Sequence, residues 1–331
     1  MTDSQTPEGC YYLAEDNDLP SNAPEEETVP QHFRCGMVSL IGRPSVGKST
    51  LLNCIVGEKV TIVSKVPQTT RCRVRGIYND DRGQIIFIDT PGLLLGKDAL
   101  DRLLIKASLS AMHEVDCIIH LVDAGEPTGK EEQEIIHRLK NVKVPIILGL
   151  NKIDLKGKFA DQYISLWEQS LGKPIQETGS PILLPLSGKT GLHVDVLIDQ
   201  IYQFLPEGPP LYPRDTVCDL PQNIAIADII REKLLGLLQA EVPHAVAVKV
   251  EEISARLNNL IKIKALILVD RESQKEIVIG KNGQMIKQIG ILAREELEDL
   301  LECKIFLDLY VRCEKKWRDN FSVLQDLGYD Q

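Results

Sequence analysis

Residues 42–49 read Gly-Arg-Pro-Ser-Val-Gly-Lys-Ser, which fits the phosphate-loop pattern of Gly, four residues and then Gly-Lys-Ser. The stretch follows the apolar run 37–41 and precedes the helical pattern Lys48–Val56, so it stands where a buried strand turns into a helix. Its glycines let the backbone wrap around an anion, and the N–H groups of the helix start point at phosphates. Lys48 is then predicted to bridge the outer phosphates, and the Ser49 hydroxyl to hold Mg²⁺. The alternative is an ordinary glycine-bearing turn, which the flanking strand and helix disfavour.

The composition is that of an ordinary soluble chain, long enough at 331 residues for two domains. Residues 1–33 hold eight acidic residues and no Lys or Arg, so −8 of the formal charge of −10 lies there. We expect a disordered acidic extension over 1–33 and a nearly neutral body. Neither a membrane span nor a signal peptide is visible, which predicts a cytoplasmic protein. The eight cysteines show no Cys-x-x-Cys pair, so reduced thiols are expected rather than disulfides or a metal site.

Between Cys35 and Leu205, apolar strands alternate with helical patterns, which indicates an α/β domain with a mostly parallel sheet covered on both faces. A turn signal at 79–83 predicts that the second and third strands form an antiparallel hairpin. Ligands of such sheets bind at the carboxyl ends of the strands. The predicted strands are Met37–Ile41, Arg73–Tyr78, Gln84–Ile88, Cys117–Val122, Pro145–Leu150 and Pro181–Leu186, and the predicted helices are Lys48–Val56, Ala99–His113, Lys130–Lys140, Asp161–Leu171 and Val194–Phe204.

Three motifs follow strands of this domain. Asp89-Thr90-Pro91-Gly92 supplies an acidic residue that can reach Mg²⁺ and a glycine N–H that can sense a terminal phosphate. In Asn151-Lys152-Ile153-Asp154, the Asp154 carboxylate can accept from both the ring N–H and the amino group of guanine, and adenine has no such pair of donors. Ser187-Gly188-Lys189 can offer a backbone N–H to the guanine carbonyl, although this pattern alone is weak. The motifs together predict GTP as the ligand.

A threonine in the stretch Lys65-Val66-Pro67-Gln68-Thr69-Thr70-Arg71 is expected to complete the Mg²⁺ shell while the terminal phosphate is present, and to let go after hydrolysis. Thr70 is the first choice and Thr69 the second. The alternative is a Ser/Thr-rich loop that only caps its own backbone.

A proline-rich break at 207–213 predicts a linker to a second domain. There a helix (Ile224–Ala240), two strands (Ala245–Val250 and Ile261–Val269), a loop, a helical stretch (Ile291–Leu301) and a last strand (Lys304–Arg312) are expected. The loop Gly280-Lys281-Asn282-Gly283 is predicted to lie between an apolar strand ending in Val278-Ile279 and a helix. It fits the backbone-clamping loop of a KH domain, with Lys287 adding positive charge.

The motifs from Gly36 to Leu205 resemble the translation-factor-related branch of the Ras-like GTPases. A single such domain joined to a C-terminal KH domain resembles the Era family over nearly all of Arg34 to Tyr329. The resemblance rests on these motifs: Gly-Arg-Pro-Ser-Val-Gly-Lys-Ser at 42–49, Gln-Thr-Thr-Arg at 68–71, Asp-Thr-Pro-Gly-Leu at 89–93, Ile-Ile-Arg-Glu-Lys-Leu at 229–234, Gly-Lys-Asn-Gly at 280–283 and Leu-Gly-Tyr at 327–329.

The resemblance implies a Ras-like P-loop domain followed by a smaller α+β KH domain of type II. It implies GTP hydrolysis with Mg²⁺, binding near the 3′ end of the small-subunit ribosomal RNA, and a role in maturing the small ribosomal subunit. It also implies peripheral association with the inner face of the cell membrane, and we expect a monomer. The expected divisions are an acidic extension (1–33), a GTPase domain (34–205), a linker (206–221) and a KH domain (222–331).

Three departures from related GTPases bear on mechanism. Leu93 stands where Ras-like enzymes carry a water-orienting glutamine, so slow hydrolysis is expected unless backbone, metal or a partner holds the water. Ser45 replaces a common Asn that is linked to potassium-assisted hydrolysis, and Gly188 replaces a common Ala.

The residues expected to act are grouped by role. Lys48, Thr70 and Gly92 are the catalytic candidates, Ser49, Thr70 and Asp89 the metal ligands, and Gly280, Lys281, Asn282, Gly283 and Lys287 the RNA contacts. The expected GTP contacts are Gly42, Arg43, Pro44, Ser45, Val46, Gly47, Lys48, Ser49, Thr50, Asp89, Thr90, Pro91, Gly92, Asn151, Lys152, Asp154, Ser187, Gly188 and Lys189.

Two other functions compete with a GTP-driven RNA-binding switch. A tRNA-modification enzyme would need a catalytic constellation in the second domain, and no cluster of Cys, His and carboxylates follows residue 213. A membrane-signalling GTPase with the KH fold as a protein-interaction module would want a lipidation motif or a basic amphipathic helix, and the sequence has neither.

Overall fold

The computed structural model describes residues 32–92, 98–113, 115–256 and 260–329. The expectations for the acidic extension, apart from its last two residues, and for Leu93 therefore fall outside the described residues. The chain divides into two compact units, one formed by 32–220 together with 318–329, the other by 221–317. We call them the sheet unit and the small unit.

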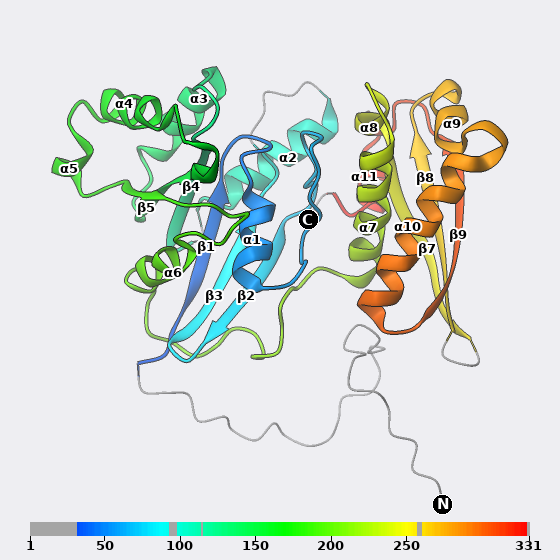
Figure 1. Ribbon diagram of the computed structural model, residues 1–331, viewed down its shortest axis with the longest axis horizontal. Helices are drawn as coiled ribbons and strands as arrows, with labels where there is room; N and C mark the ends of the chain where they lie inside the picture. Colours follow the sequence, from blue (N-terminus) through cyan, green and yellow to red (C-terminus); the bar gives the residue numbers. More distant parts are fainter. Residues whose placement is uncertain (1–31, 93–97, 114, 257–259, 330–331) are drawn as a thin grey trace, which may run out of the picture. The chain divides into compact units, whose positions relative to one another are not determined.

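A six-stranded sheet forms the centre of the sheet unit, in the order β2-β3-β1-β4-β5-β6 (Figure 1). All neighbouring strands are parallel except β2 and β3, which form the antiparallel hairpin that the turn signal predicts. Every residue of β3 and β4 is buried, as expected for strands covered on both faces. The strands are β1 (Arg34–Ile41), β2 (Val74–Asp80), β3 (Gly83–Asp89), β4 (Cys117–Asp123), β5 (Ile146–Asn151) and β6 (Ile182–Pro185).

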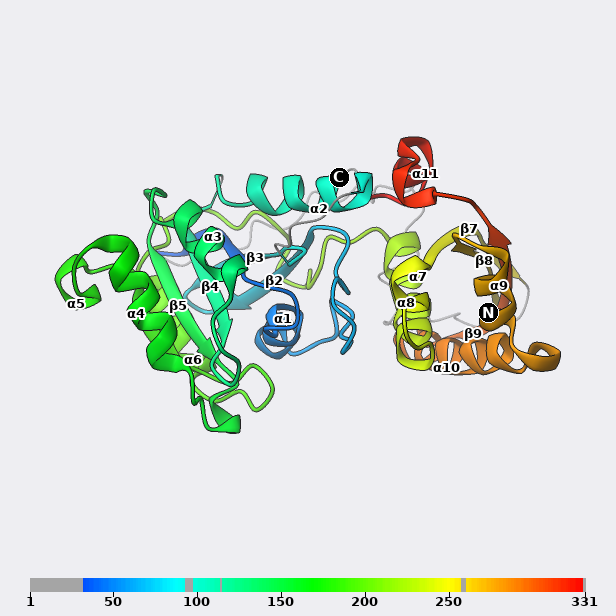
Figure 2. The same ribbon diagram turned by 90° about the horizontal axis from the view of Figure 1, so that it is seen from above.

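Two apolar cores lie on opposite faces of this sheet. One core contains buried residues of α1 and α6, and the other contains residues of α3 and α4 with Ala111 and Met112 just after α2. Figure 2 shows α2 and α3 on one side of the sheet, and α1 and α6 on the other. The helices are α1 (Lys48–Val56), α2 (Ala99–Ser110), α3 (Lys130–Leu139), α4 (Ala160–Leu171), the short α5 (Ile175–Thr178) and α6 (Val194–Tyr202).

Two further segments complete the sheet unit. The segment after α6 runs along the edge of the sheet, where Glu207 pairs with Arg34 and Cys218 with Gly76 in isolated bridges. The end of the chain from Arg318, with the last two residues of η3 (Trp317–Asp319) and with α11 (Phe321–Asp326), packs on the same unit, and Arg318 forms ion pairs with Asp98 and Asp101.

The small unit has a three-stranded sheet in the order β7-β8-β9, with β7 antiparallel and β9 parallel to β8. Its core joins buried residues of this sheet with residues of α7 and α10. The strands are β7 (Ala247–Arg256), β8 (Leu260–Val269) and β9 (Lys304–Cys313), and the helices are α7 (Gln222–Leu237), α8 (Val242–Ala245), α9 (Glu272–Ile279), η2 (Lys281–Gly283) and α10 (Gln284–Leu301).

One sequence prediction for the small unit is wrong. Val278 and Ile279 do not end an apolar strand before the glycine loop, because they form the last turn of α9. Gln274 and Val278 are the buried residues of this helix, and residues four apart share one helical face. The Gln274 side chain also accepts from the backbone N–H groups of Asp270 and Arg271, which fixes the start of the helix.

None of the helices in the described ranges combines the length and apolar character needed to cross a membrane.

Candidate functional site

The phosphate loop connects β1 to α1, as predicted. Gly47 has φ = 101°, a left-handed conformation that glycine adopts without strain, and a Cβ there would lie 2.5 Å from the Asn151 amide nitrogen. Lys48 is buried, and its ammonium donates to the carbonyl oxygens of Gly42 at 3.1 Å and Arg43 at 3.0 Å. The lysine therefore lies folded across its own loop.

Burial lowers the pKa of Lys48 to about 8, although the carboxylates of Asp89 and Glu132 oppose that shift. A phosphate bound in the loop would bring negative charge to the ammonium and favour its protonated form. The electrostatics of the loop therefore suit an anionic ligand.

A cavity of about 360 Å³ opens in front of the loop. The phosphate loop forms one side, the segment 62–70 another, and Gly92 and Lys152 close the rest. The lining includes Pro44, Ser45, Gly47, Lys48, Ser49, Thr50, Thr70, Gly92 and Lys152 from the residues expected to act, and also Thr69, the second choice for the metal-binding threonine. Residues predicted from separate motifs thus line one cavity.

The three predicted metal ligands lie together beside this cavity. Ser49 Oγ donates to Asp89 Oδ2 at 2.7 Å and lies 3.0 Å from Thr70 Oγ1, which in turn lies 3.4 Å from Asp89 Oδ2. The other carboxylate oxygen, Asp89 Oδ1, is buried with no hydrogen-bond partner among the described residues. Burial also raises the pKa of Asp89, against the pull of Lys48. Oxygen donors and an unsatisfied buried carboxylate oxygen fit Mg²⁺.

The two candidate threonines are distinguished by their contacts. Thr70 reaches Ser49 and Asp89, whereas the Thr69 hydroxyl donates to the backbone oxygen of Val66 at 2.7 Å. The Thr69 hydroxyl therefore bonds to the backbone of its own loop, which is the behaviour that the alternative interpretation of this stretch predicts.

The predicted base loops are joined to the phosphate loop by side chains. The Asn151 amide donates to Val46 O at 2.8 Å and accepts from the Gly188 N–H at 2.9 Å. Lys152 donates to Ser45 O at 2.8 Å. Asn151 and Lys152 therefore connect the loops through hydrogen bonds. Asp154, in η1 (Ile153–Leu155), is exposed and available to a base.

The remaining predicted GTP contacts lie in the neighbouring loops. Thr90 Oγ1 donates to Leu40 O at 2.8 Å, which anchors the turn that carries Pro91 and Gly92. Ser187 Oγ accepts from the Thr190 N–H at 3.2 Å and shapes its loop, and Lys189 is exposed. Asp123, whose carboxylate pairs with Lys152 at 2.6 Å, is not among the residues predicted from the sequence. Its position at the carboxyl end of β4 is the signal that would have found it.

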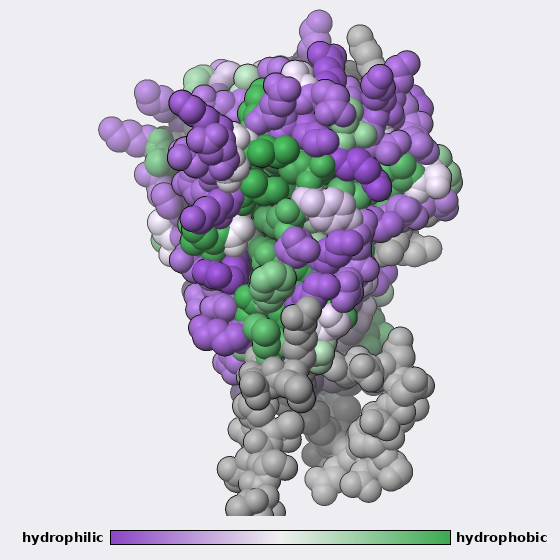
Figure 3. All heavy atoms as spheres, turned by 90° about the vertical axis from the view of Figure 1, so that its right-hand side faces the viewer, coloured by the Kyte–Doolittle hydropathy of each residue, from purple (hydrophilic) through white to green (hydrophobic). Residues whose placement is uncertain are grey.

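In the small unit, the glycine loop lies between α9 and α10. Gly283 has φ = 73°, and no heavy atom lies within 4 Å of the place that a Cβ would take, so a side chain there is strained by the backbone rather than by crowding. Lys281, Asn282 and Lys287 are exposed around the loop. Figure 3 shows apolar side chains in a continuous stripe on the face that carries α9, α10 and β9. Half-buried apolar residues of α10 and β9 on this core include Met285, Ile286, Leu307, Leu309 and Val311.

Comparison with known proteins assigns both units. The family described as "50S ribosome-binding GTPase" matches residues 37–152, and the family described as "KH domain" matches residues 241–318. The GTPase Era of Halothermothrix orenii is 42% identical over 298 residues, which cover 90% of this chain and 99% of the relative. The GTPase Era of Geotalea uraniireducens is 44% identical over 305 residues, which cover 91% and 99% of the two chains.

Two solved structures are similar over the same extent. An Aquifex aeolicus Era variant bound to GDP and AlF4⁻ superposes with a TM-score of 0.84 at 38% identity, covering 90% of this chain and 100% of that one. Era in complex with MgGDPNP and nucleotides 1506–1542 of 16S ribosomal RNA superposes with a TM-score of 0.84 at 38% identity, covering 91% and 100%.

Proposed function

The chain belongs to the Era family of GTPases, and from that premise we propose that it is a nucleotide-gated RNA-binding switch in small-subunit assembly. It hydrolyses GTP to GDP and phosphate and uses Mg²⁺ with the nucleotide. Its KH domain binds the small-subunit ribosomal RNA near the 3′ end. A relative solved with nucleotides 1506–1542 of 16S ribosomal RNA supports this choice of RNA.

The observation that carries the proposal is that one chain holds two complete recognition elements. Ser49, Thr70 and Asp89 meet beside a phosphate loop in the sheet unit, and in the small unit a Gly-x-x-Gly loop is followed directly by half-buried apolar residues of α10. The first binds a nucleotide with its metal, and the second clamps a nucleic-acid backbone while bases lie on the apolar stripe.

Each residue of the nucleotide site has a definite task in this proposal. Bound Mg²⁺ would neutralise charge on the outer phosphates, held by Ser49, Thr70 and Asp89. Lys48, whose ammonium lies against the carbonyl oxygens of Gly42 and Arg43, meets the outer phosphates, and the Gly92 N–H senses the terminal one. Asp154 selects guanine, while Asn151 and Lys152 keep the base loop and the phosphate loop together.

Hydrolysis supplies the switch. Thr70 belongs to the segment 62–70 that lines the cavity, and it would hold Mg²⁺ only while the terminal phosphate is present. Release of Thr70 and Gly92 after hydrolysis frees that segment, and the RNA affinity of the KH domain changes with it. Because Leu93 cannot orient water by hydrogen bonding, intrinsic hydrolysis is slow unless backbone, metal or a partner holds the water.

The experiment that tests the proposal measures affinity for an RNA ending in the 3′ tail of the small-subunit ribosomal RNA, first with GDP and then with a non-hydrolysable GTP analogue. Tighter binding with the analogue is expected. Gly283→Asp should abolish it by placing a charged side chain at a backbone position with φ = 73°. Gly236→Asp is the matched control, because Gly236 is exposed on α7 with open space around it. Equal RNA affinity in both nucleotide states would refute the switch.

The proposal includes further expectations about the chain. It divides into an acidic extension (1–33), a GTPase domain (34–205), a linker (206–221) and a KH domain (222–331). The protein works as a cytoplasmic monomer with peripheral association at the inner membrane. Sedimentation of the purified protein, alone and with vesicles of anionic lipid, tests the last two expectations.

A further inference from the structure

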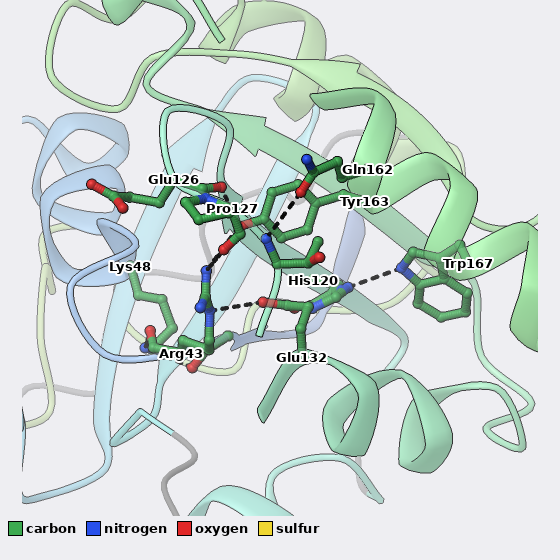
Figure 4. A network of polar contacts seen from close by, with 11 residues as sticks. Arg43, Lys48, His120, Glu126, Pro127, Glu132, Gln162, Tyr163 and Trp167 are labelled. Carbon is green, nitrogen blue, oxygen red and sulfur yellow. Dashed lines mark hydrogen bonds and ion pairs between the residues drawn. The ribbon is translucent and has the colours of Figure 1, made fainter. Parts of the chain in front are cut away.

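The Arg43 side chain leaves the phosphate loop and enters a network of polar groups behind it (Figure 4). Its guanidinium donates to Tyr163 Oη at 2.8 Å and to Pro127 O at 3.3 Å, and its Nε forms an ion pair with Glu132 Oε2 at 2.9 Å. Pro127 precedes α3, Glu132 lies in its first turn, and Tyr163 lies in α4. One side chain of the loop is therefore held by three separate segments.

Glu132 is in turn held by a fully buried histidine. His120 Nε2 lies 2.6 Å from Glu132 Oε1, and the Trp167 indole N–H donates to His120 Nδ1 at 3.1 Å. An indole N–H can only donate, so Nδ1 must accept and the ring proton lies on Nε2. His120 is then neutral and donates to Glu132, which leaves the charge of the carboxylate to face Arg43.

The network reaches the phosphates through the backbone of Arg43. The carbonyl oxygen of Arg43 accepts from Lys48 Nζ at 3.0 Å, so the residue fixed by its side chain also holds the lysine that meets the phosphates. Tyr163 Oη, which accepts from Arg43, donates to Glu126 O at 3.0 Å. Burial raises the pKa of Tyr163 to about 12, so this hydroxyl keeps its proton. The guanidinium is thus held between Tyr163, Pro127 and Glu132.

We propose that Glu132 and His120 are positioning residues for nucleotide binding, which act through Arg43 to keep the phosphate loop in its binding conformation before the nucleotide arrives. The inference rests on the proposed nucleotide site. Because GDP and GTP share the phosphates cradled by the loop, the network affects the affinity for both equally. The chemical step at saturating GTP does not depend on it.

The test compares Glu132→Gln with the wild type. Glutamine keeps the shape and can still accept from His120, but it has no charge for Arg43. The dissociation constants for GDP and for a non-hydrolysable GTP analogue should both rise about tenfold, with kcat within about twofold. Glu134→Gln is the control on the same helix, since Glu134 pairs with Arg138 at a half-exposed site away from Arg43. Unchanged affinity, or a loss of kcat alone, would overturn the inference.

A double-mutant cycle separates positioning from general damage to the core. In an Arg43→Met background, Glu132→Gln should cause no further loss of affinity, whereas additive losses would show that Glu132 does not act through Arg43. If Glu132→Gln does not fold, Trp167→Phe removes the orienting N–H together with part of the indole ring, and an equal weakening of the binding of both nucleotides is expected. Unchanged affinity of that variant would also overturn the inference. Failure of the wild type itself to bind GDP would instead refute the proposed nucleotide site.

Discussion

Thr70 and Thr69 are neighbours with different contacts, and only Thr70 lies with Ser49 and Asp89. Thr70→Ala should lower the rate of GTP hydrolysis about a hundredfold, because it removes an oxygen that acts only with the terminal phosphate in place. GDP affinity should not change. Thr69→Ala should leave the rate of hydrolysis within about twofold, since the Thr69 hydroxyl donates to the backbone oxygen of Val66. Phosphate release at saturating Mg²⁺ measures both rates, and equal effects of the two variants would contradict the assignment.

The pKa of Lys48 predicts how GDP affinity varies with pH. In the free protein, burial lowers this pKa to about 8, whereas bound phosphate favours the charged lysine and raises it. Lys48 is mostly charged in both states below pH 8, so affinity should be nearly constant there. Above pH 8 the free protein must take up a proton to bind, and affinity should fall about tenfold between pH 7 and pH 9.

Titration calorimetry in two buffers of different ionisation enthalpy would detect this proton uptake. Lys48→Arg is the control, because a guanidinium does not titrate in this range and its GDP affinity should not carry this pH dependence. A wild-type profile as flat as that of the variant would contradict the prediction.

Asp98 joins two elements of the sheet unit. Its side chain caps the N-terminus of α2 by accepting from the Asp101 N–H at 2.7 Å, and it also pairs with Arg318 near the end of the chain. Asp98→Ala should lower the free energy of unfolding by about 1–2 kcal/mol through loss of the cap alone. Urea denaturation measures this value. Asp161→Ala, in the first turn of α4 without a capping bond, should cost only a few tenths of a kcal/mol.

Most elements of the sheet unit could be predicted because their apolar patterns are long and because functional motifs stand at the ends of the strands. The phosphate loop, the hairpin and the motifs after β3 and β5 lie where the sequence predicts them. The strand expected before Gly280 is wrong because Val278-Ile279 is a two-residue apolar run, which cannot distinguish a strand end from the last turn of a helix. The buried face of α9 becomes visible only at four-residue spacing, through Gln274 and Val278.

The network around Arg43 could not be predicted from the sequence. Glu132 is one of three glutamates of α3, beside the half-buried Glu131 and Glu134, and nothing in the sequence marks it as the buried one. His120 occupies an apolar strand in which every residue is buried. Their pairing depends on the distance between a strand and a neighbouring helix, which no local pattern encodes. Gly188 shows a similar limit, since an added Cβ would lie 3.0 Å from Leu51, a contact invisible in the loop sequence.

The two units have separate cores, and each unit contains one of the two tryptophans. Trp167 is buried in the core beside α3 and α4, and Trp317 is buried in the small unit, where its N–H donates to Ala245 O. Fluorescence of Trp317→Phe therefore reports unfolding of the sheet unit, and fluorescence of Trp167→Phe reports unfolding of the small unit.

GDP with Mg²⁺ should stabilise only the unit that binds it. At a ligand concentration of a hundred times Kd, stabilisation is about 2.7 kcal/mol, which raises the melting temperature of a unit of this size by about 5–10 °C. The transition reported by Trp167 should shift by this amount, and removal of Mg²⁺ with EDTA should reduce the shift. The transition reported by Trp317 should shift with the RNA but not with GDP, even when GDP is present at a hundred times its Kd for Trp167→Phe. A single transition that responds to both ligands would mean that the two cores unfold together, and the separation into units would then not extend to their stability.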